Sequence, residues 1–441
     1  MKILILTVGG SHQPLLKAIE QTRPDAIHFI CSDDGDQGRP GSYHQVIGKG
    51  KVLRGKPPTV PPTAPDLPNL ATLAGLEPSR FHIYKIARPD NLDDCFRSTA
   101  ELIEAIRKAH PSADILVDYT GGTKSMTAGL TAAALNDGRC MFQLVTGRRD
   151  DLRQVTDGTE FVRSVRVEEV QMRRAFTQAN ELLLRFDYIG AARLLETAAE
   201  QNYNDVAHAA FQRSLDLARA FDAWDRFEHE KARSLLQGYK ADFHEHHAHL
   251  SLHLEGKGHG WELVEDLLLN AERRAKQERY DDAAGRLYRA LELTVQVWLR
   301  KCHGIETGTV NLAKVPDVSR KRLAGLATGS GKVQIGLLAA WDLLKDWPED
   351  VLAPLFEPKR GAFLKHLETR NDSLFAHGEE PVSKLDFEAF NSFCTGFIPA
   401  CINTALSALN FRRRNQPLMQ FPTSFSQPSN TKPTSAQHHH E

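Results

Sequence analysis

Ile115-Leu-Val-Asp-Tyr-Thr-Gly-Gly-Thr-Lys-Ser125 decides the fold of the first part of the chain. Ile115–Tyr119 is predicted to be a strand, and Ile3–Val8 is a continuous apolar run, which is typical of a strand buried on both faces. The strand at Ile115–Tyr119 ends in a loop of small residues, and a helical pattern follows at Met126–Leu135. A strand that passes through such a loop into a helix indicates a parallel sheet covered by helices.

The same alternation of strand and helix surrounds this stretch. A helix is predicted at Leu92–Ala109, and further strands are predicted at Ile3–Val8, Ala26–Cys31, Phe81–Ala87 and Cys140–Thr146. Val155–Thr159 is typical of a hairpin that adds β-structure at the end of the domain. We therefore predict a Rossmann-like α/β domain at residues 1–168, interrupted by an irregular proline-rich insertion at about 33–70.

Two small-residue loops follow strands of this sheet, at Gly9-Gly10-Ser11 and at Thr120-Gly121-Gly122-Thr123-Lys124. In such sheets ligands bind outside the carboxyl ends of the strands. Glycine lets backbone N–H groups approach an anion, and a helix N-terminus and the Lys124 ammonium favour negative charge. These loops predict a phosphate-bearing ligand, and the alternative is that each is only a tight turn.

Known nucleotide-binding fingerprints do not fit these loops. G-x-G-x-x-G is absent, and Thr123 stands where a P-loop has the glycine before its lysine. Leu326–Val333 comes closer to a P-loop, but Leu326 replaces the first glycine and Val333 replaces the metal-binding Ser or Thr. The sequence therefore argues against an ATPase site.

From Glu169 the hydrophobic period becomes helical and stays so, which predicts an all-α domain at residues 169–415. Residues 416–441 are rich in Pro, Ser, Thr and Gln, and we expect a disordered tail. The run His244–His259 contains neither H-E-x-x-H nor H-x-H-x-D-H. A polar, solvated helix is therefore favoured over a metal site there.

Arg370-Asn-Asp-Ser-Leu-Phe-Ala-His377-Gly378 pairs a cation with a group that titrates near neutral pH. We predict one helix from Leu364 to His377, with Gly378 as its stop. Seven residues are about two helical turns, so Arg370 and His377 would share one face, with Asn371 beside the arginine. An arginine that binds phosphate and a histidine that moves protons suit phosphodiester cleavage. The alternative is an Arg–His contact that only holds helices together.

Composition sets limits on the function. The chain has 441 residues, 41% of them hydrophobic, and a formal net charge of -1, so nucleic acid must be bound by local patches. Six scattered cysteines without a C-x-x-C indicate reduced thiols in a cytoplasmic protein. No apolar run is long enough for a membrane span or a signal peptide.

Three stretches together resemble one known family. Val117–Leu130 looks like the signature loop of the CARF (CRISPR-associated Rossmann fold) domain. Arg279–Glu292 is similar to a helix of the family's C-terminal domain, and Arg370–His377 fits the HEPN pattern of Arg, four to six residues and His. In this order they resemble the type III CRISPR-associated CARF–HEPN ancillary ribonucleases of the Csm/Csx type. The spacing of six intervening residues and the proline-rich insertion depart from the common pattern.

The resemblance implies a homodimer with one composite pocket for a cyclic oligoadenylate, either the tetra- or the hexa-adenylate. Ser32, at the end of the second strand, would line this pocket together with Gly9, Gly10, Ser11 and Thr120–Lys124. Paired HEPN domains would cleave single-stranded RNA by attack of its 2′-OH, with Arg370, Asn371 and His377 as catalytic residues. No metal or other cofactor is implied. The link to the type III effector complex would be functional, without stable binding.

Three other functions remain open. A ring nuclease would degrade the cyclic oligoadenylate in the CARF pocket, with Ser11, Gln13 and Lys124 as hypothetical participants. A CARF-type ligand-responsive regulator would need a basic DNA-reading helix, and none is convincing. A metal-dependent nuclease would use the His244–His259 run.

Overall fold

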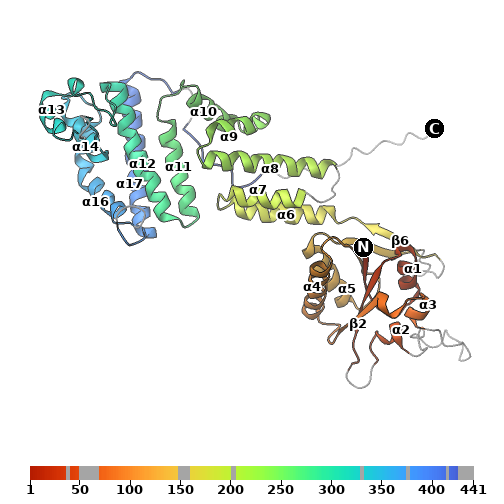
Figure 1. The fold of residues 1–441 in the computed structure, drawn as a ribbon. Helices are drawn as coiled ribbons and strands as arrows, with labels where there is room; N and C mark the ends of the chain where they lie inside the picture. The colour runs from red at the N-terminus through yellow and green to blue at the C-terminus, as the bar shows by residue number, and fades with distance from the viewer. Residues whose placement is uncertain are drawn as a thin grey trace, which may run out of the picture. The chain divides into compact units, whose positions relative to one another are not determined.

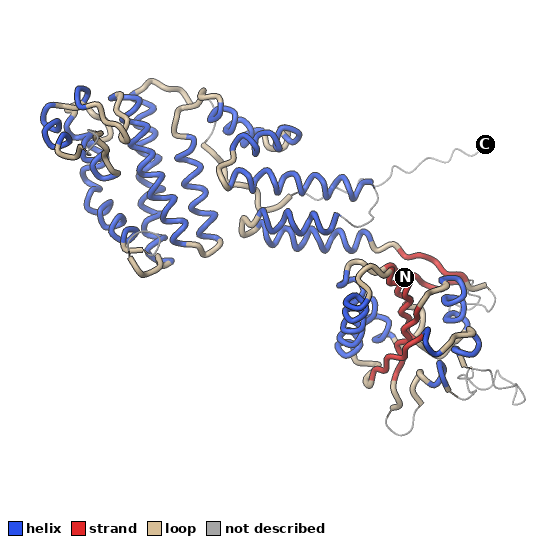
Figure 2. Tube along the Cα trace, viewed as in Figure 1, coloured by secondary structure: helices blue, strands red, loops and turns tan. Residues whose placement is uncertain are grey.

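The computed structural model describes residues 1–35, 40–48, 69–147, 159–199, 205–327, 332–373, 378–413 and 417–425. The chain divides into two compact units, Met1–Arg174 and Ala175–Glu441, whose ribbon and trace are drawn in Figures 1 and 2. The sequence placed this boundary at 168/169. The division instead falls inside helix α6 (Glu168–Leu183), which begins at the predicted boundary.

The first unit contains a six-stranded sheet of order β3-β2-β1-β4-β5-β6. The first five strands in this order are parallel, as predicted, and β6 is antiparallel to β5. The β-structure predicted at the end of the domain is present as β6, while residues 155–158 of the predicted hairpin lie outside the described residues. The strands are β1 (Lys2–Thr7), β2 (Ala26–Ser32), β3 (Phe81–Ile86), β4 (Asp114–Asp118), β5 (Met141–Thr146) and β6 (Phe161–Val165).

Strand β1 is central and buried on both faces, as its unbroken apolar run predicts. Ile3 and Ile5 pack with residues of α4 (Leu92–Ala109) and α5 (Lys124–Asp137). Leu4 and Leu6 pack on the opposite face with residues of α1 (Gln13–Thr22). Two helical layers therefore cover the sheet, and the carboxyl ends of the parallel strands form one shared edge (Figure 1).

The insertion predicted as irregular at 33–70 is ordered at its two ends. Short helices α2 (His44–Ile47) and α3 (Leu70–Leu73) each bury one apolar residue, Val46 and Leu70, in the core on the α1 side of the sheet. The prediction was therefore wrong for His44–Ile47, because a single apolar residue in a proline-rich stretch gave no periodic signal, whereas α3 begins where the predicted insertion ends. Residues 36–39 and 49–68 lie outside the described residues.

The second unit is helical, which confirms the predicted all-α domain. Beyond α6 its helices are α7 (Tyr188–Ala199), α8 (Asp205–Asp225), α9 (His229–Leu236), α10 (His244–Leu254), α11 (Glu262–Lys276), α12 (Tyr280–Trp298), α13 (Asp317–Ala324), α14 (Leu337–Leu343), α15 (Ala353–Phe356), α16 (Arg360–Asn371) and α17 (Lys384–Ala408). Short 3-10 segments separate some of them, and a π-helical turn at Leu299–His303 continues α12.

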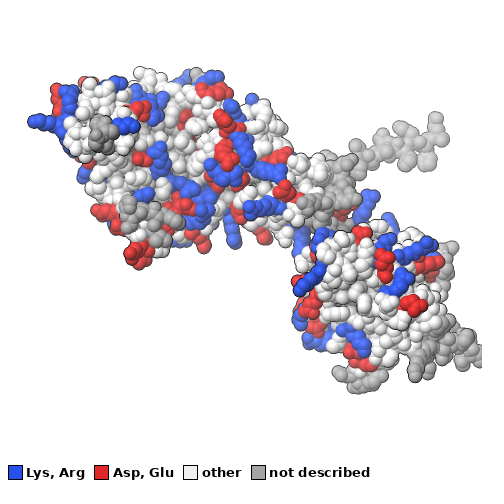
Figure 3. All heavy atoms as spheres, viewed as in Figure 1, with Lys and Arg blue, Asp and Glu red and all other residues white. Residues whose placement is uncertain are grey.

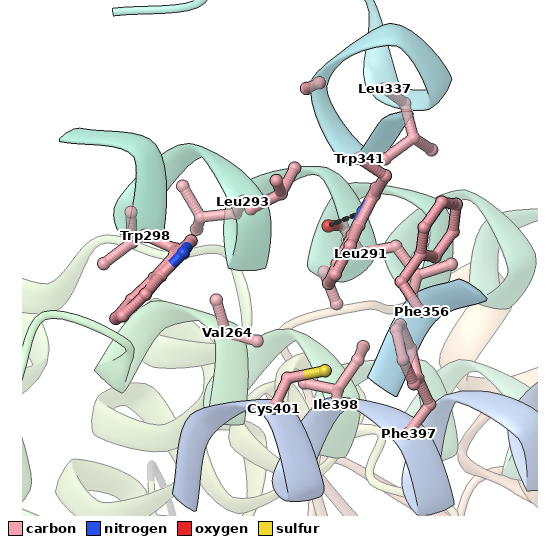
Figure 4. Close-up of a cluster of buried hydrophobic side chains, with 14 of the residues drawn as sticks. Val264, Leu291, Leu293, Trp298, Leu337, Trp341, Phe356, Phe397, Ile398 and Cys401 are labelled. Carbon is pink, nitrogen blue, oxygen red and sulfur yellow. Dashed lines mark hydrogen bonds between the residues drawn. The ribbon is translucent and has the colours of Figure 1, made fainter. Parts of the chain in front are cut away.

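The core of the second unit is built on α11, α12, α14 and α17 (Figure 4). Trp341 of α14 is fully buried, and its Nε1 donates to the Leu291 carbonyl oxygen of α12 at 3.2 Å. Phe356 and Phe397 lie against its ring, with centroids 5.2 and 5.1 Å away. Because a buried indole needs a partner for its N–H, this bond fixes α14 on α12.

The chain end is only partly as predicted. Leu418, Phe421 and Phe425 are buried, with exposed fractions of 9%, 2% and 6%. The prediction of a disordered tail from residue 416 is therefore wrong for residues 417–425, because their few large apolar side chains pack against residues that are distant in the sequence. Residues 426–441 lie outside the described part of the chain.

Charge and cysteine placement follow the composition. Figure 3 shows basic and acidic side chains interspersed on the visible face of each unit, in keeping with the formal net charge of -1. All six cysteines are free thiols, and all but Cys302 are buried. None of the helices that the structure describes is both long enough and apolar enough to cross a membrane.

Candidate functional site

The two glycine loops predicted to share the carboxyl edge of the sheet are in direct contact. A Cβ atom on Gly9 would lie 2.5 Å from the amide nitrogen of Gly122, and one on Gly121 would lie 2.4 Å from the Thr7 carbonyl oxygen. Gly122 also has φ of +91°, which favours glycine. Glycine is therefore required at these three positions for the loops to meet. Gly10 differs, because a Cβ there would enter open space.

The N-terminus of α5 begins at this edge. Thr123 is its N-cap, and the side chain accepts a hydrogen bond from the Met126 amide at 3.2 Å. The Thr123 and Ser125 hydroxyls donate to the backbone carbonyls of Pro89 and Asp90, so both are occupied within the fold. Lys124 is exposed, and no described carboxylate pairs with it. The ammonium and the helix end together offer positive potential at the edge.

Asp118, at the end of β4, holds the loop that begins at Thr120 in place through hydrogen bonds. Its carboxylate accepts from the Thr120 amide at 2.9 Å and from Gln143 Nε2 at 3.1 Å. Burial raises the pKa of Asp118, against the opposing effect of these bonds. The Thr120 hydroxyl accepts from the Val145 amide at 2.8 Å, so Thr120 holds the loop rather than presenting a free hydroxyl.

Ser32 lies at the same edge but is engaged in the fold. Its amide donates to the Ser42 hydroxyl at 2.9 Å, and the Ser42 amide donates to the Ser32 hydroxyl at 2.8 Å. This reciprocal pair fastens the start of the insertion to the end of β2. Ser11, in contrast, is exposed just before α1.

Lys85 on β3 is a cation at this edge that sequence reasoning missed. Its Nζ lies 3.1 Å from Asp33 Oδ1 and 3.4 Å from the centroid of the Tyr43 ring. Hydrogen bonding to Asp33 raises the pKa of Lys85. A single lysine in a strand carries no signal in the sequence, so only the pairing of β3 with β2 reveals it.

In the second unit, Arg370 lies in the last turn of α16 and is half-buried. Its guanidinium carbon is 4.5 Å from the centroid of the Tyr288 ring on α12, and Nη1 donates to Asn371 Oδ1 at 3.2 Å. None of the described carboxylates forms an ion pair with it. The arginine is thus held by an aromatic face and keeps its charge available for an anion.

The predicted single helix from Leu364 to His377 is wrong, because α16 ends at Asn371 with Asp372 as its C-cap. Asn, Asp and Ser side chains compete for backbone hydrogen bonds and so favour helix ends. The Gly378 amide donates to the Ser373 carbonyl oxygen at 3.1 Å, seven residues beyond the end of α16. Gly378 is therefore not a helix stop, and a shared helical face cannot be the reason for the Arg370–His377 pairing. His377 lies outside the described residues.

Parts of this chain resemble known proteins. Residues 255–400 match the family model described as "Csm6 HEPN domain". The solved structure of Enterococcus italicus Csm6 bound to cyclic hexa-2'-fluoro-hexa-dAMP matches with a TM-score of 0.59 at 12% sequence identity. That match covers 94% of this chain and 96% of the Csm6 chain. The resemblance to the HEPN domain of Csm6 is therefore confirmed for residues 255–400, and the likeness over the whole chain is one of fold.

A type III CRISPR defence DNA nuclease activated by cyclic oligoadenylate also matches, with a TM-score of 0.23 and 15% identity over 49% of this chain and 33% of that one. No curated protein matches the sequence. Within the HEPN match lie both Tyr288 and Arg370, together with the segment that contains His377.

The histidine run begins with α10, which precedes the HEPN match, and His259 lies beyond α10 within that match. His246, His247 and His249 are buried, with exposed fractions of 6%, 6% and 3%, so the prediction of a solvated helix is wrong. Burial lowers the pKa of all three. Within the described ranges no three metal-binding side chains cluster. Neutral histidine packs like an aromatic residue, and its burial has no periodic signature in this run.

Proposed function

We propose that the chain is a cyclic-oligoadenylate-activated, metal-independent endoribonuclease that cleaves single-stranded RNA. One observation carries the proposal: within a segment that matches the Csm6 HEPN domain, Arg370 is held against Tyr288 and pairs with no carboxylate among the described residues. A cation presented in this way is suited to a phosphodiester, because its N–H groups remain available for phosphate oxygens.

The activator would bind at the carboxyl edge of the CARF sheet. Gly10 and Ser11 are exposed there, and Lys124 provides an ammonium that no described carboxylate neutralises. The E. italicus Csm6 structure is of a complex with a cyclic hexanucleotide analogue, which supports a cyclic oligoadenylate as the class of ligand. The same chemistry would suit either a tetra- or a hexa-adenylate.

RNA supplies its own nucleophile, the 2′-OH, so the reaction has no need of a metal-activated water. Arg370 would bind the scissile phosphate and stabilise the charge that develops in the transition state. His377 would act as general acid or base, and Asn371, bonded to Arg370, would position the guanidinium. The expected products carry a 2′,3′-cyclic phosphate and a 5′-OH.

One chain brings one such arginine and one such histidine. In a homodimer with two-fold symmetry, two HEPN domains would contribute two of each to a composite site, and two CARF domains would enclose one ligand. The dimer is therefore part of the proposal, and an enzyme diluted below its dimerisation constant should lose activity faster than its concentration falls.

The test is RNA cleavage in EDTA, with and without cyclic tetra- and hexa-adenylate, by the wild type, Arg370→Ala and His377→Ala. We expect cleavage only with one of the two rings, and none with either variant. Cleavage by both variants equal to that of the wild type would overturn the assignment of the HEPN site. Degradation of the cyclic oligoadenylate without cleavage of the RNA would instead identify a ring nuclease.

A further inference from the structure

Three helical hairpins of the second unit, α6–α7, α8–α9 and α11–α12, share one local geometry (Figure 1). The turn of each contains a non-glycine residue in the left-handed region, Phe186, Phe227 or Glu278, with φ of 56°, 61° and 60°. The next amide donates to the carbonyl oxygen five residues earlier, at 3.0 Å for Asp187–Leu182, 2.9 Å for Glu228–Ala223 and 3.0 Å for Arg279–Arg274. Each first helix thus ends in a Schellman motif.

The same three turns are flanked by the same buried residues. Alanine stands seven residues before and five residues after each left-handed residue, and leucine stands nine residues after it. These positions are at most 1% exposed: Ala179, Ala191, Leu195, Ala220, Ala232, Leu236, Ala271, Ala283 and Leu287. Gly256 after α10 also has a positive φ, but this flanking pattern is absent there. The hairpins are therefore internal repeats of one helix–turn–helix unit, with α10 inserted before the third.

Residues 417–425 contact all three hairpins through Gln420 and Phe421. Gln420 Nε2 donates to the Leu269 carbonyl oxygen at 3.1 Å, and its Oε1 accepts from Arg273 Nη1 at 2.8 Å. Leu269 and Arg273 belong to α11, the first helix of the third hairpin. The amide side chain is thus held by both a donor and an acceptor.

Phe421 fills an aromatic pocket between the hairpins. Its ring lies 4.9 Å from that of Trp224 and 5.1 Å from that of Phe221, both on α8, and 6.1 Å from that of Tyr188 on α7. The Arg273 guanidinium lies 3.7 Å from the centroid of the Phe421 ring. The Tyr188 hydroxyl donates to the Pro422 carbonyl oxygen at 2.8 Å, which fixes the backbone beyond the ring.

The buried Arg273 side chain shows that Gln420 and Phe421 occupy a specific site on the hairpins and do not merely touch them by chance. Its side chain is 0% exposed and pairs with Asp225 at 2.8 Å and Asp266 at 3.2 Å. The third nitrogen, Nη1, has Gln420 as its partner. Removing Gln420 leaves a donor of a buried cation without its bond, which is costly unless water or another acceptor replaces it. Met419, by contrast, is 51% exposed, so its side chain takes no part in this contact.

We propose that the three hairpins form a groove for an extended peptide with a Gln-Phe-Pro core, and that residues 417–425 occupy it in cis. Helical repeat arrays bind extended segments by such side-chain pockets. The segment 417–425 follows α17, the last described helix of the second unit. Because it contacts α7, α8 and α11, it connects the three repeats. The proposal does not depend on the nuclease assignment.

The test uses the full-length chain and a fluorescent peptide of residues 417–425, followed by polarisation. The wild-type groove is occupied, so we expect little binding, whereas the double variant Gln420→Ala, Phe421→Ala should bind the peptide at least tenfold more tightly. A peptide carrying Phe421→Ala should not bind, and one carrying Met419→Ala should bind like the unaltered peptide.

Equal binding by the wild type and the double variant would overturn the proposal, as would a folded double variant that does not bind. If the double variant does not fold, the single variant Gln420→Ala replaces it. The unaltered peptide should then raise the melting temperature of Gln420→Ala by several degrees and leave that of the wild type unchanged. No rise in the melting temperature of Gln420→Ala would overturn the proposal equally.

Discussion

Arg370 and Tyr288 face each other across α16 and α12, with the guanidinium carbon 4.5 Å from the ring centroid. They come from two stretches that are separate in the sequence, Arg279–Glu292 and Arg370–His377. Burial raises the pKa of Tyr288, with a smaller effect of Glu292 in the same direction, so the ring stays a neutral phenol at neutral pH. A neutral ring orients the arginine without cancelling its charge, as a carboxylate would.

Arg370→Ala should lower the rate of RNA cleavage by about 100- to 1000-fold, the usual loss when one group that stabilises a developing charge is removed. Arg370→Lys should retain less than a tenth of the activity, because an ammonium lacks the planar fork of donors. Single-turnover cleavage at saturating activator measures this loss.

Tyr288→Phe keeps the ring and should cleave like the wild type, whereas Tyr288→Leu should be slower. Equal rates for the phenylalanine and leucine variants would contradict a role for the ring.

Gly10→Ala should weaken binding of the cyclic oligoadenylate without lowering stability. A Cβ at this position meets nothing within the protein, so any effect must come from the ligand. Gly122→Ala is the contrasting variant, because its φ of +91° and a Cβ 2.9 Å from Thr7 Cβ should destabilise the first unit by about 1–3 kcal/mol. Calorimetric titration and thermal unfolding separate the two effects. Unchanged affinity in Gly10→Ala would place the ligand away from this loop.

The first unit should lose stability between pH 6.5 and pH 4, in part through His28. Burial, with His82 and His110 nearby, lowers the pKa of His28 from 6.5 to about 4. In this interval the unfolded chain binds a proton at His28 and the folded chain does not, so acid favours unfolding. His28→Gln should therefore melt with a smaller difference between pH 7 and pH 5 than the wild type. His244→Gln, at an exposed histidine, should leave that difference unchanged; a similar reduction there would refute the role of His28.

The sequence was sufficient for elements whose signal is local and periodic. Strands β1 and β4 and helix α4 lie within one residue of the predicted ranges, because burial of a strand in the sheet or of one helical face dictates the pattern. The two glycine loops could be placed together by topology alone, since carboxyl ends of parallel strands meet at one edge. What these loops bind stays a prediction.

Three features were not predicted from the sequence. Their causes are residues distant in the sequence or interactions that compete with the local pattern. The end of α16 at Asn371 reflects polar side chains that compete for backbone hydrogen bonds within an otherwise helical period. Phe421 is buried by Trp224 and Tyr188, which lie far from it in the sequence. The internal repeats were hidden because phenylalanine or glutamate stands where the turn favours glycine.

The glutamate in the turn of the third hairpin gives a direct prediction. Glu278 is exposed with φ of 60°, a conformation that costs a non-glycine residue about 1–2 kcal/mol. Glycine loses about 0.5–1 kcal/mol more chain entropy on folding, so Glu278→Gly should still stabilise the second unit by about 0.5–1 kcal/mol. Thermal unfolding should show a rise of about 2 °C. Glu278→Ala keeps the strained backbone and should show no rise. Phe227→Gly should destabilise, because Phe227 packs against the core of the unit. A gain in Glu278→Ala equal to that in Glu278→Gly would assign the effect to the glutamate side chain instead of the turn.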